Sequence, residues 1–286
     1  LPLTILRYHD EEVLVLEMGM NHLQEMSRLS MIARPDIACI TNVGTAHIGE
    51  LGSRENILKA KLEITDGMKE GSTLIINQDN DMLQTVELPH LNVVRVGKGK
   101  EASIQASHIV LEETKSSFEV EYQGKKEIIE VPVQGEHNIS NALIAIAVGI
   151  ELNISLEDIK KGIQEFKLTK NRMDILEKNH KTVIDGTYNA SVDSMKSSID
   201  VLANYKKRKV AILADMLELG DYSQQLHEEV GSYVASKGID ILVCVGKEAK
   251  YIYQKAKENM KDVYYFESNQ EVIARLDELL KEDDVI

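Results

Sequence analysis

The sequence predicts an α/β protein of two domains, and three observations support this fold class. The chain has 286 residues, whereas a single domain usually takes about 100–200. Short apolar, β-branched runs alternate with segments of helical periodicity. Strands of alternating character interrupt this order over residues 102–133, and strand–helix units resume after residue 168. We therefore expect a first domain (1–168) with a mostly parallel sheet and an antiparallel β section, followed by a doubly wound α/β domain (169–286).

The elements of the first domain follow from their apolar patterns. Near-continuous apolar runs are typical of parallel strands covered on both faces, whereas alternation is typical of antiparallel strands. Ser53 is a good N-cap at the start of a helical pattern. The expected elements are strands at 13–18, 37–43 and 72–77, a helix over 53–68, antiparallel strands over 102–133 with a turn at Gly124-Lys125, and helices over 138–152 and 156–166.

The second domain repeats one unit, a short apolar strand followed by a helix. Ser191 is the expected N-cap of its first helix. The strands are expected in TVIDG (182–186), KVAILADM (209–216), ILVCVG (241–246) and VYYFES (263–268), and the helices over 192–205, 223–236, 247–258 and 270–282.

The composition excludes several classes of partner. Thirty-three Lys and Arg against 47 Asp and Glu give a net charge of −14, which argues against a nucleic-acid groove or an anionic membrane surface as main partner. No run approaches the roughly 18 apolar residues of a membrane-spanning helix. Cys39 and Cys244 lie in apolar runs, so we expect buried, reduced thiols in a cytosolic protein.

Two polar residues follow apolar runs of the first domain, at the strand edge where α/β sheets bind ligands. Glu17 ends the run 13–18, and His47 lies just past the run 37–43. A carboxylate and an imidazole at one edge suit a metal site, although Mg²⁺ usually prefers oxygen ligands. The alternative is that Glu17 makes a surface hydrogen bond and His47 caps a helix. The residue types alone leave both interpretations open.

Five motifs occur together and in order. They are LEMGMN (16–21), TNVGTAHIGELGS (41–53) with ILKAKLEI (57–64), GEHNISNALIA (135–145), YNASVDSM (188–195) and DMLELG (215–220). In this combination the chain resembles the Mur ligase family of ATP-dependent amide-forming enzymes, and LEMGMN and DMLELG resemble its MurF type. The resemblance covers essentially the whole chain. It implies a central ATP-binding domain over 1–168 and a Rossmann-like C-terminal ligase domain over 169–286.

The resemblance also implies a reaction and its substrates. The terminal carboxylate of UDP-MurNAc-tripeptide attacks the γ-phosphate of ATP, and the amine of D-Ala-D-Ala then displaces phosphate from the acyl phosphate. Glu17, His47 and Lys61 match the family's catalytic Mg²⁺ site, and Lys61 matches a lysine that is carbamylated in many members. A carbamate offers Mg²⁺ carboxylate-like oxygens, whereas an ammonium repels it. Lys59 is a neighbouring alternative for the modified lysine. Without the resemblance, both lysines would be interpreted as part of a solvent-exposed helix face.

The nucleotide contacts implied by the resemblance come from both domains. They are Asn141, Arg172, Asp185, Tyr188 and Asn189. Taken alone, Arg172 would be a surface charge at the domain boundary, and the neighbouring Asn138 would be an N-cap.

The ribose contact departs from the family pattern. The family has an acidic residue directly before the position of Thr187, where this chain has Gly186. Asp185 therefore reaches the ribose through a shifted turn, which a positive φ at Gly186 would allow, or the contact is missing. In DMLELG, Asp215 and Glu218 are assigned no catalytic role.

The phosphate-binding motif G-x-x-x-x-G-K-[ST] does not occur in the 286 residues. Because this motif is absent and the chain starts at Leu1 and ends in a strand-like DDVI, we expect a fragment. Without the phosphate loop, the fragment is expected to be inactive by itself. The full protein is expected to be a cytoplasmic monomer without nucleic-acid or membrane partners. The alternatives are another Mur-type ligase, resembling folylpolyglutamate or cyanophycin synthetase, and a noncatalytic nucleotide-binding module without a phosphate loop.

Overall fold

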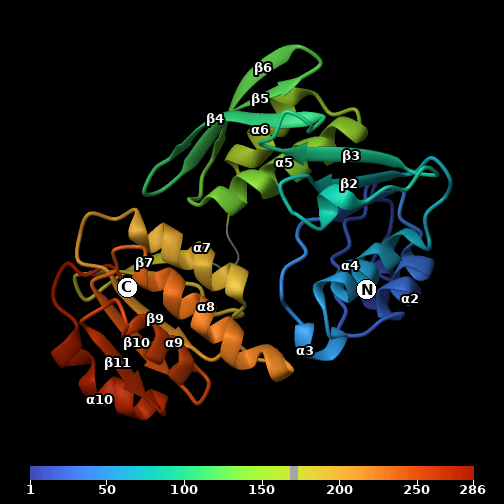
Figure 1. Ribbon diagram of the computed structural model, residues 1–286. Helices are drawn as coiled ribbons and strands as arrows, with labels where there is room; N and C mark the ends of the chain where they lie inside the picture. Colours follow the sequence, from blue (N-terminus) through green and yellow to red (C-terminus); the bar gives the residue numbers. More distant parts are fainter. Residues whose placement is uncertain (168–172) are drawn as a thin grey trace. The chain divides into compact units, whose positions relative to one another are not determined.

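The computed structural model describes residues 1–167 and 173–286. Its contacts divide the chain into two compact units (Figure 1). Unit 1 comprises Leu1–Ile109, Phe118–Ile129 and Ile139–Ile163, and unit 2 comprises Val110–Ser117, Glu130–Asn138 and Gln164–Ile286. The predicted boundary between residues 168 and 169 lies outside the described residues.

A six-stranded sheet lies mainly in unit 1, and its strands are neighbours in chain order, β1-β2-β3-β4-β5-β6. The first four pair in parallel, with Cys39 opposite Ile75 and Ile75 opposite Val94. The inner strand β2 has four buried residues in succession, as a strand covered on both faces requires. The strands are β1 (Ile37–Ile40), β2 (Thr73–Asn77), β3 (Asn92–Gly97), β4 (Ile104–Leu111), β5 (Ser116–Tyr122) and β6 (Lys125–Val131).

Strands β4 to β6 form the expected antiparallel section. They follow one another through short turns, and β5 alternates buried and partly exposed residues over its first five positions. The second turn is formed by Gln123 and Gly124, both at positive φ (49° and 75°), and β6 begins at Lys125. The turn therefore lies one residue before the predicted Gly124-Lys125, because two left-handed residues are what a two-residue hairpin needs.

The helices of unit 1 include the predicted capped helix. The Ser53 hydroxyl accepts a hydrogen bond from the Asn56 N–H (3.2 Å) and begins α4, which confirms Ser53 as N-cap. The long α5 buries Ile139, Leu143 and Ile146. The helices are α1 (Pro2–Ile5), α2 (Glu25–Ala33), α3 (Ile48–Leu51), α4 (Arg54–Leu62), α5 (Glu136–Glu151), α6 (Leu156–Gln164) and the 3₁₀ turns η1 (Glu63–Thr65) and η2 (Leu83–Thr85).

The predicted strand at 13–18 is wrong. These residues have no regular structure, and Val13, Leu14 and Val15 are exposed by 49%, 41% and 83%. Their composition favours a strand, but a strand also needs a partner for its backbone groups. In the sheet of the described residues, β1 is an edge strand and residues 13–18 do not pair with it.

Unit 2 contains a parallel sheet of order β11-β10-β9 and the hairpin β7-β8. Val285 bridges Thr182 of β8 and Lys209 beside β9, both in parallel. The last residues of the chain therefore lie as a strand between β8 and β9, in agreement with the strand-like DDVI. The strands are β7 (Asp174–Lys178), β8 (Lys181–Asp185), β9 (Val210–Ala214), β10 (Ile241–Val245) and β11 (Val263–Phe266).

Helices alternate with these strands as predicted. A capping box between Ser191 and Ser194 begins α7, which confirms Ser191 as N-cap. Strand β10 is buried along its whole length, and Val243, Val245 and Val272 share one core cluster. The helices are α7 (Val192–Ala203), η3 (Gly220–Tyr222), α8 (Ser223–Ala235), α9 (Ala249–Ala256) and α10 (Asn269–Leu279).

Both cysteines are free thiols. Cys244 is fully buried as expected, whereas Cys39 is only partly buried because β1 is an edge strand. Burial raises the pKa of the Cys39 thiol to about 11 and raises that of Cys244 further. Within the described part of the chain, no helix combines the length and the apolar character needed to cross a membrane.

Candidate functional site

The proposed metal ligands Glu17, His47 and Lys61 all lie in unit 1. Glu17 is exposed in the irregular segment before α2. His47 is the N-cap residue of α3 in the left-handed conformation (φ 63°), and its carbonyl accepts hydrogen bonds from Glu50 and Leu51 (both 3.1 Å). Helix α3 packs against α4, which carries Lys61. The fold therefore brings the elements of His47 and Lys61 together.

Lys61 lies in the last turn of α4 and is partly buried. Among the described residues its amine makes no hydrogen bond or ion pair, and burial lowers its pKa. An amine in this setting is more easily neutral, and only a neutral amine reacts with CO₂. The neighbouring Lys59 is exposed, so of the two lysines Lys61 has the setting that favours this reaction.

Glu63 lies two residues after Lys61, and its side chain binds backbone groups at the start of α2, the helix that follows the Glu17 segment. Its two carboxylate oxygens accept hydrogen bonds from the Gln24 N–H (2.8 Å each), and one also accepts from Ser27 (3.3 Å). It therefore caps the N-terminus of α2 from a distance of 39 residues along the chain. The sequence showed Glu63 only as a letter of the KLEI motif and gave no signal for this contact.

In the part of the chain that the structure describes, acidic and imidazole side chains alone do not form a metal site. Across residues 1–167 and 173–286, no group of three or more His, Cys, Asp or Glu side chains is placed to hold a metal ion. A site based on Glu17 and His47 therefore needs a further donor. A carbamate on Lys61 would be such a donor.

Asn141 is exposed on the second turn of α5, where it is accessible to a ligand. Asn138 lies inside the first turn of the same helix and donates from its side chain to the Gln134 carbonyl (2.8 Å). Asn138 is therefore not the N-cap that its residue type suggested, because the helix begins at Glu136.

Asp185 is the last residue of β8 and holds the turn that follows. Its Oδ1 accepts hydrogen bonds from the Thr187 N–H (3.0 Å) and hydroxyl (2.7 Å). Gly186 does not have a positive φ, so the turn is not shifted in the predicted way. One carboxylate oxygen is thus engaged within the turn.

Tyr188 and Asn189 follow in the same turn, and Tyr188 is 64% exposed. Both line a cavity of about 430 Å³ within unit 2 that also contacts Gly186, Asp215 and Leu217. The cavity lies where β8 and β9 end, the position at which parallel α/β sheets bind ligands. Arg172, the remaining predicted nucleotide contact, lies outside the described residues.

Asp215 of the DMLELG motif has a structural role. The Asp215 carboxylate accepts from the N–H groups of Lys247, Glu248 and Ala249 (2.7–3.1 Å) and so caps α9. The fully buried His227 accepts the Met216 N–H on Nε2 (3.0 Å). These contacts fix the loop after β9.

Two family models match this chain, one after the other. The Mur ligase middle domain matches residues 1–149, and the Mur ligase glutamate ligase domain matches residues 171–286. The UDP-N-acetylmuramoyl-tripeptide–D-alanyl-D-alanine ligase of Bacillus subtilis is 35% identical over 100% of this chain. The chain spans 63% of the length of that relative.

Two solved structures are similar over nearly the whole chain. MurF from Acinetobacter baumannii superposes with a TM-score of 0.87 and 30% identity, covering 94% of this chain and 60% of the other. MurF from Thermotoga maritima, solved in complex with ADP, also has a TM-score of 0.87, with 26% identity and coverage of 99% and 65%. Because the middle-domain match alone takes more than half of the residues, this chain belongs to the Mur ligase family.

Proposed function

We propose that the protein is an ATP-dependent carbon–nitrogen ligase of peptidoglycan precursor synthesis that joins D-Ala-D-Ala to UDP-MurNAc-tripeptide. The observation that carries the proposal is the 35% identity to the Bacillus subtilis D-alanyl-D-alanine ligase across all of this chain. The ADP-bound MurF of similar fold supports the use of ATP. We further propose a cytoplasmic monomer, with a domain boundary near residue 168.

The proposed reaction has two steps. A carboxylate oxygen of the tripeptide attacks the γ-phosphorus of ATP and releases ADP, which gives an acyl phosphate. The D-Ala-D-Ala amine then attacks the acyl carbon and expels inorganic phosphate, which leaves an amide. Both steps depend on placing groups and neutralising phosphate charge.

The residues of this chain would act mainly by binding and orienting the nucleotide. In this proposal Asn141, Tyr188 and Asn189 contact ATP, and their exposure is consistent with that role. The Arg172 guanidinium would bind phosphate oxygens through its fork. Asp185 would contact the ribose with Oδ2, because Oδ1 is engaged by Thr187.

The donor set fits a Mg²⁺ ion only if Lys61 is modified. Glu17, His47 and a carbamate on Lys61 would hold the ion, which when bound neutralises charge on the transferring phosphoryl group. The Lys61 amine is partly buried, has no partner among residues 1–167 and 173–286, and has a lowered pKa, which supports the carbamate.

The 286 residues alone are not expected to ligate, because they contain no phosphate-loop motif. Phosphate release measured on this chain with ATP and both substrates should stay at the level of a blank. Robust turnover would refute this part of the proposal.

A chimaera tests the function itself. Residues 1–286 would replace the matching segment of the Bacillus subtilis relative, and phosphate release would be measured with UDP-MurNAc-tripeptide. We expect release that depends on D-Ala-D-Ala. Dependence on glutamate instead would point to a ligase of the folylpolyglutamate type, and a folded chimaera that binds ATP without turnover would point to a noncatalytic module.

A further inference from the structure

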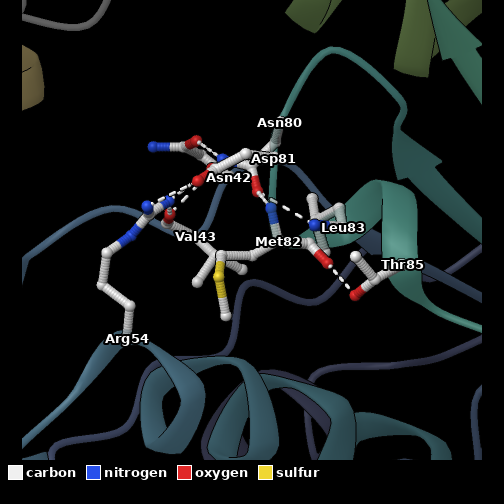
Figure 2. A network of polar contacts seen from close by, with 8 residues as sticks. All are labelled: Asn42, Val43, Arg54, Asn80, Asp81, Met82, Leu83 and Thr85. Carbon is white, nitrogen blue, oxygen red and sulfur yellow. Dashed lines mark hydrogen bonds and ion pairs between the residues drawn. The ribbon is translucent and has the colours of Figure 1, made fainter.

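The connection between β1 and α3 carries His47 and has little regular structure of its own. After β1 ends at Ile40, residues 41–44 are irregular. The fixed point within them is the Val43 carbonyl, which accepts hydrogen bonds from the Arg54 guanidinium (2.7 Å) and the Asn80 amide (3.3 Å). Figure 2 shows both donors converging on this part of the connection.

Arg54 is itself held in one orientation. Its two terminal nitrogens donate to the two oxygens of Asp81 (2.7 and 2.6 Å). The hydrogen bonds from Arg54 are the main cause of the lowered Asp81 pKa. A two-point pairing between planar groups sets direction as well as distance, so the nitrogen that reaches Val43 has a defined position (Figure 2).

Asn80 is the second side chain that binds the Val43 carbonyl, and hydrogen bonds to other residues also fix its orientation. Its amide nitrogen donates to the Asn42 side chain (2.7 Å), while its oxygen accepts from the Met82 and Leu83 N–H groups (3.1 and 3.0 Å). Two consecutive residues of the connection are therefore held by the turn after β2.

Arg54 and Lys61 lie on one face of α4. They are the first residue and the eighth residue of the helix, seven positions apart, which is nearly two full turns and about 10 Å along the axis. The face of α4 that holds the His47 connection through Arg54 is thus the face that presents Lys61.

We propose that Arg54, held by Asp81, is a positioning residue that places His47 relative to Lys61 for metal binding. Three residues (44–46) lie between the anchored Val43 and His47, and the start of α3 holds the far end of this span. The metal role of His47 belongs to the proposed function, whereas the anchoring of residues 42–47 stands independently of it.

The test uses this chain and two readouts. Arg54→Lys keeps the charge but loses the fork, and Asp81→Asn leaves Arg54 without its partner. Hydrogen–deuterium exchange at residues 42–47 reports the anchoring, and Mn²⁺ titration followed by electron paramagnetic resonance reports the metal site. We expect faster exchange at 42–47 in both variants and Mn²⁺ affinity lower by about 10-fold or more, the usual range for partners of metal ligands.

Arg95→Lys is the matched control, because Arg95 also joins a backbone carbonyl (Val86) and a carboxylate (Glu87), but on a different loop. It should alter exchange around 86–87 and leave Mn²⁺ affinity unchanged. Wild-type exchange at 42–47 in both test variants, with circular dichroism showing them folded, would overturn the proposal. If His47→Ala leaves Mn²⁺ binding unchanged, His47 is not a metal ligand and the proposed function is wrong on this point. The exchange data would then still test whether Arg54 holds residues 42–47 in place.

Discussion

Replacing Asp284 with asparagine removes the carboxylate that joins the end of the chain to the sheet of unit 2. The Asp284 side chain is 1% exposed and accepts two hydrogen bonds from Arg208 (2.7 and 2.6 Å) and one from the Lys281 N–H (2.7 Å). Breaking a buried pair of this kind costs about 3–5 kcal/mol. Because asparagine keeps one acceptor and the shape, we expect a loss of about 3 kcal/mol in the free energy of unfolding.

The neighbouring residue provides the control. Asp283 pairs with Lys207 at 3.3 Å, but the two side chains are 80% and 54% exposed. Asp283 has a positive φ of 67°, which asparagine tolerates well. Asp283→Asn makes the same charge change and should cost about 1 kcal/mol or less.

Urea unfolding followed by circular dichroism measures both variants, since the chain has no tryptophan. Amide exchange at Thr182 and Ile184 gives a local readout, because these N–H groups bind the carbonyls of Asp284 and Ile286. We expect Asp284→Asn to lower protection there and Asp283→Asn to leave it unchanged. Equal effects of the two substitutions would refute the assignment of stability to the buried pair.

The loss of stability caused by Asp284→Asn should become smaller as the pH falls. Burial raises the pKa of Asp284, but the hydrogen bonds from Arg208 and Lys281 outweigh it and hold the pKa below its ordinary value. A carboxylate with a lowered folded pKa stabilises the protein above its unfolded pKa of about 3.9, and this contribution fades as pH falls through the folded pKa. The difference between wild type and Asp284→Asn should therefore be full at neutral pH and shrink in acid below about pH 4.

Two further predictions concern α4 and its flank. Protein equilibrated with ¹³C-bicarbonate should show a carbamate resonance in the NMR spectrum. Lys61→Ala should abolish this resonance, whereas Lys59→Ala, at an exposed position, should retain it. Survival of the signal in Lys61→Ala would exclude Lys61 as the modified residue. Glu63→Gln should lower the free energy of unfolding by about 1–3 kcal/mol, because an amide cannot accept the Gln24 N–H on both atoms, whereas the exposed Glu70→Gln should change it by less than about 0.5 kcal/mol. Urea titration of the two glutamate variants checks this, and equal values would contradict the capping role of Glu63.

Most of the fold could be predicted because its signals are local. The strand–helix units of residues 181–279 and the caps Ser53 and Ser191 depend on residues a few positions apart. Strand β7, with the sequence DILEK, was missed because a charged, exposed hairpin strand lacks an apolar pattern. The run 13–18 was predicted as a strand because composition cannot show whether a pairing partner exists.

The site was predictable only as far as its motifs extend. Lys61 and Tyr188 stand in recognisable motifs, and in the structure Lys61 is partly buried whereas Tyr188 is exposed. The contacts between Arg54 and Asp81 and between Glu63 and Gln24 join residues 27 and 39 positions apart. Such pairs depend on the folded path of the chain, and no spacing in the sequence indicates them.

The transfer of oxygen from substrate to phosphate tests the proposed ligase reaction most directly. In the chimaera with the Bacillus subtilis relative, the tripeptide would carry ¹⁸O in its terminal carboxylate, and the released phosphate would be analysed by mass spectrometry. When the amine attacks the acyl phosphate, the expelled phosphate takes the bridging carboxylate oxygen with it, so we predict one ¹⁸O in each phosphate released in the presence of D-Ala-D-Ala. Phosphate without the label would mean that water attacks ATP directly, and it would contradict the account.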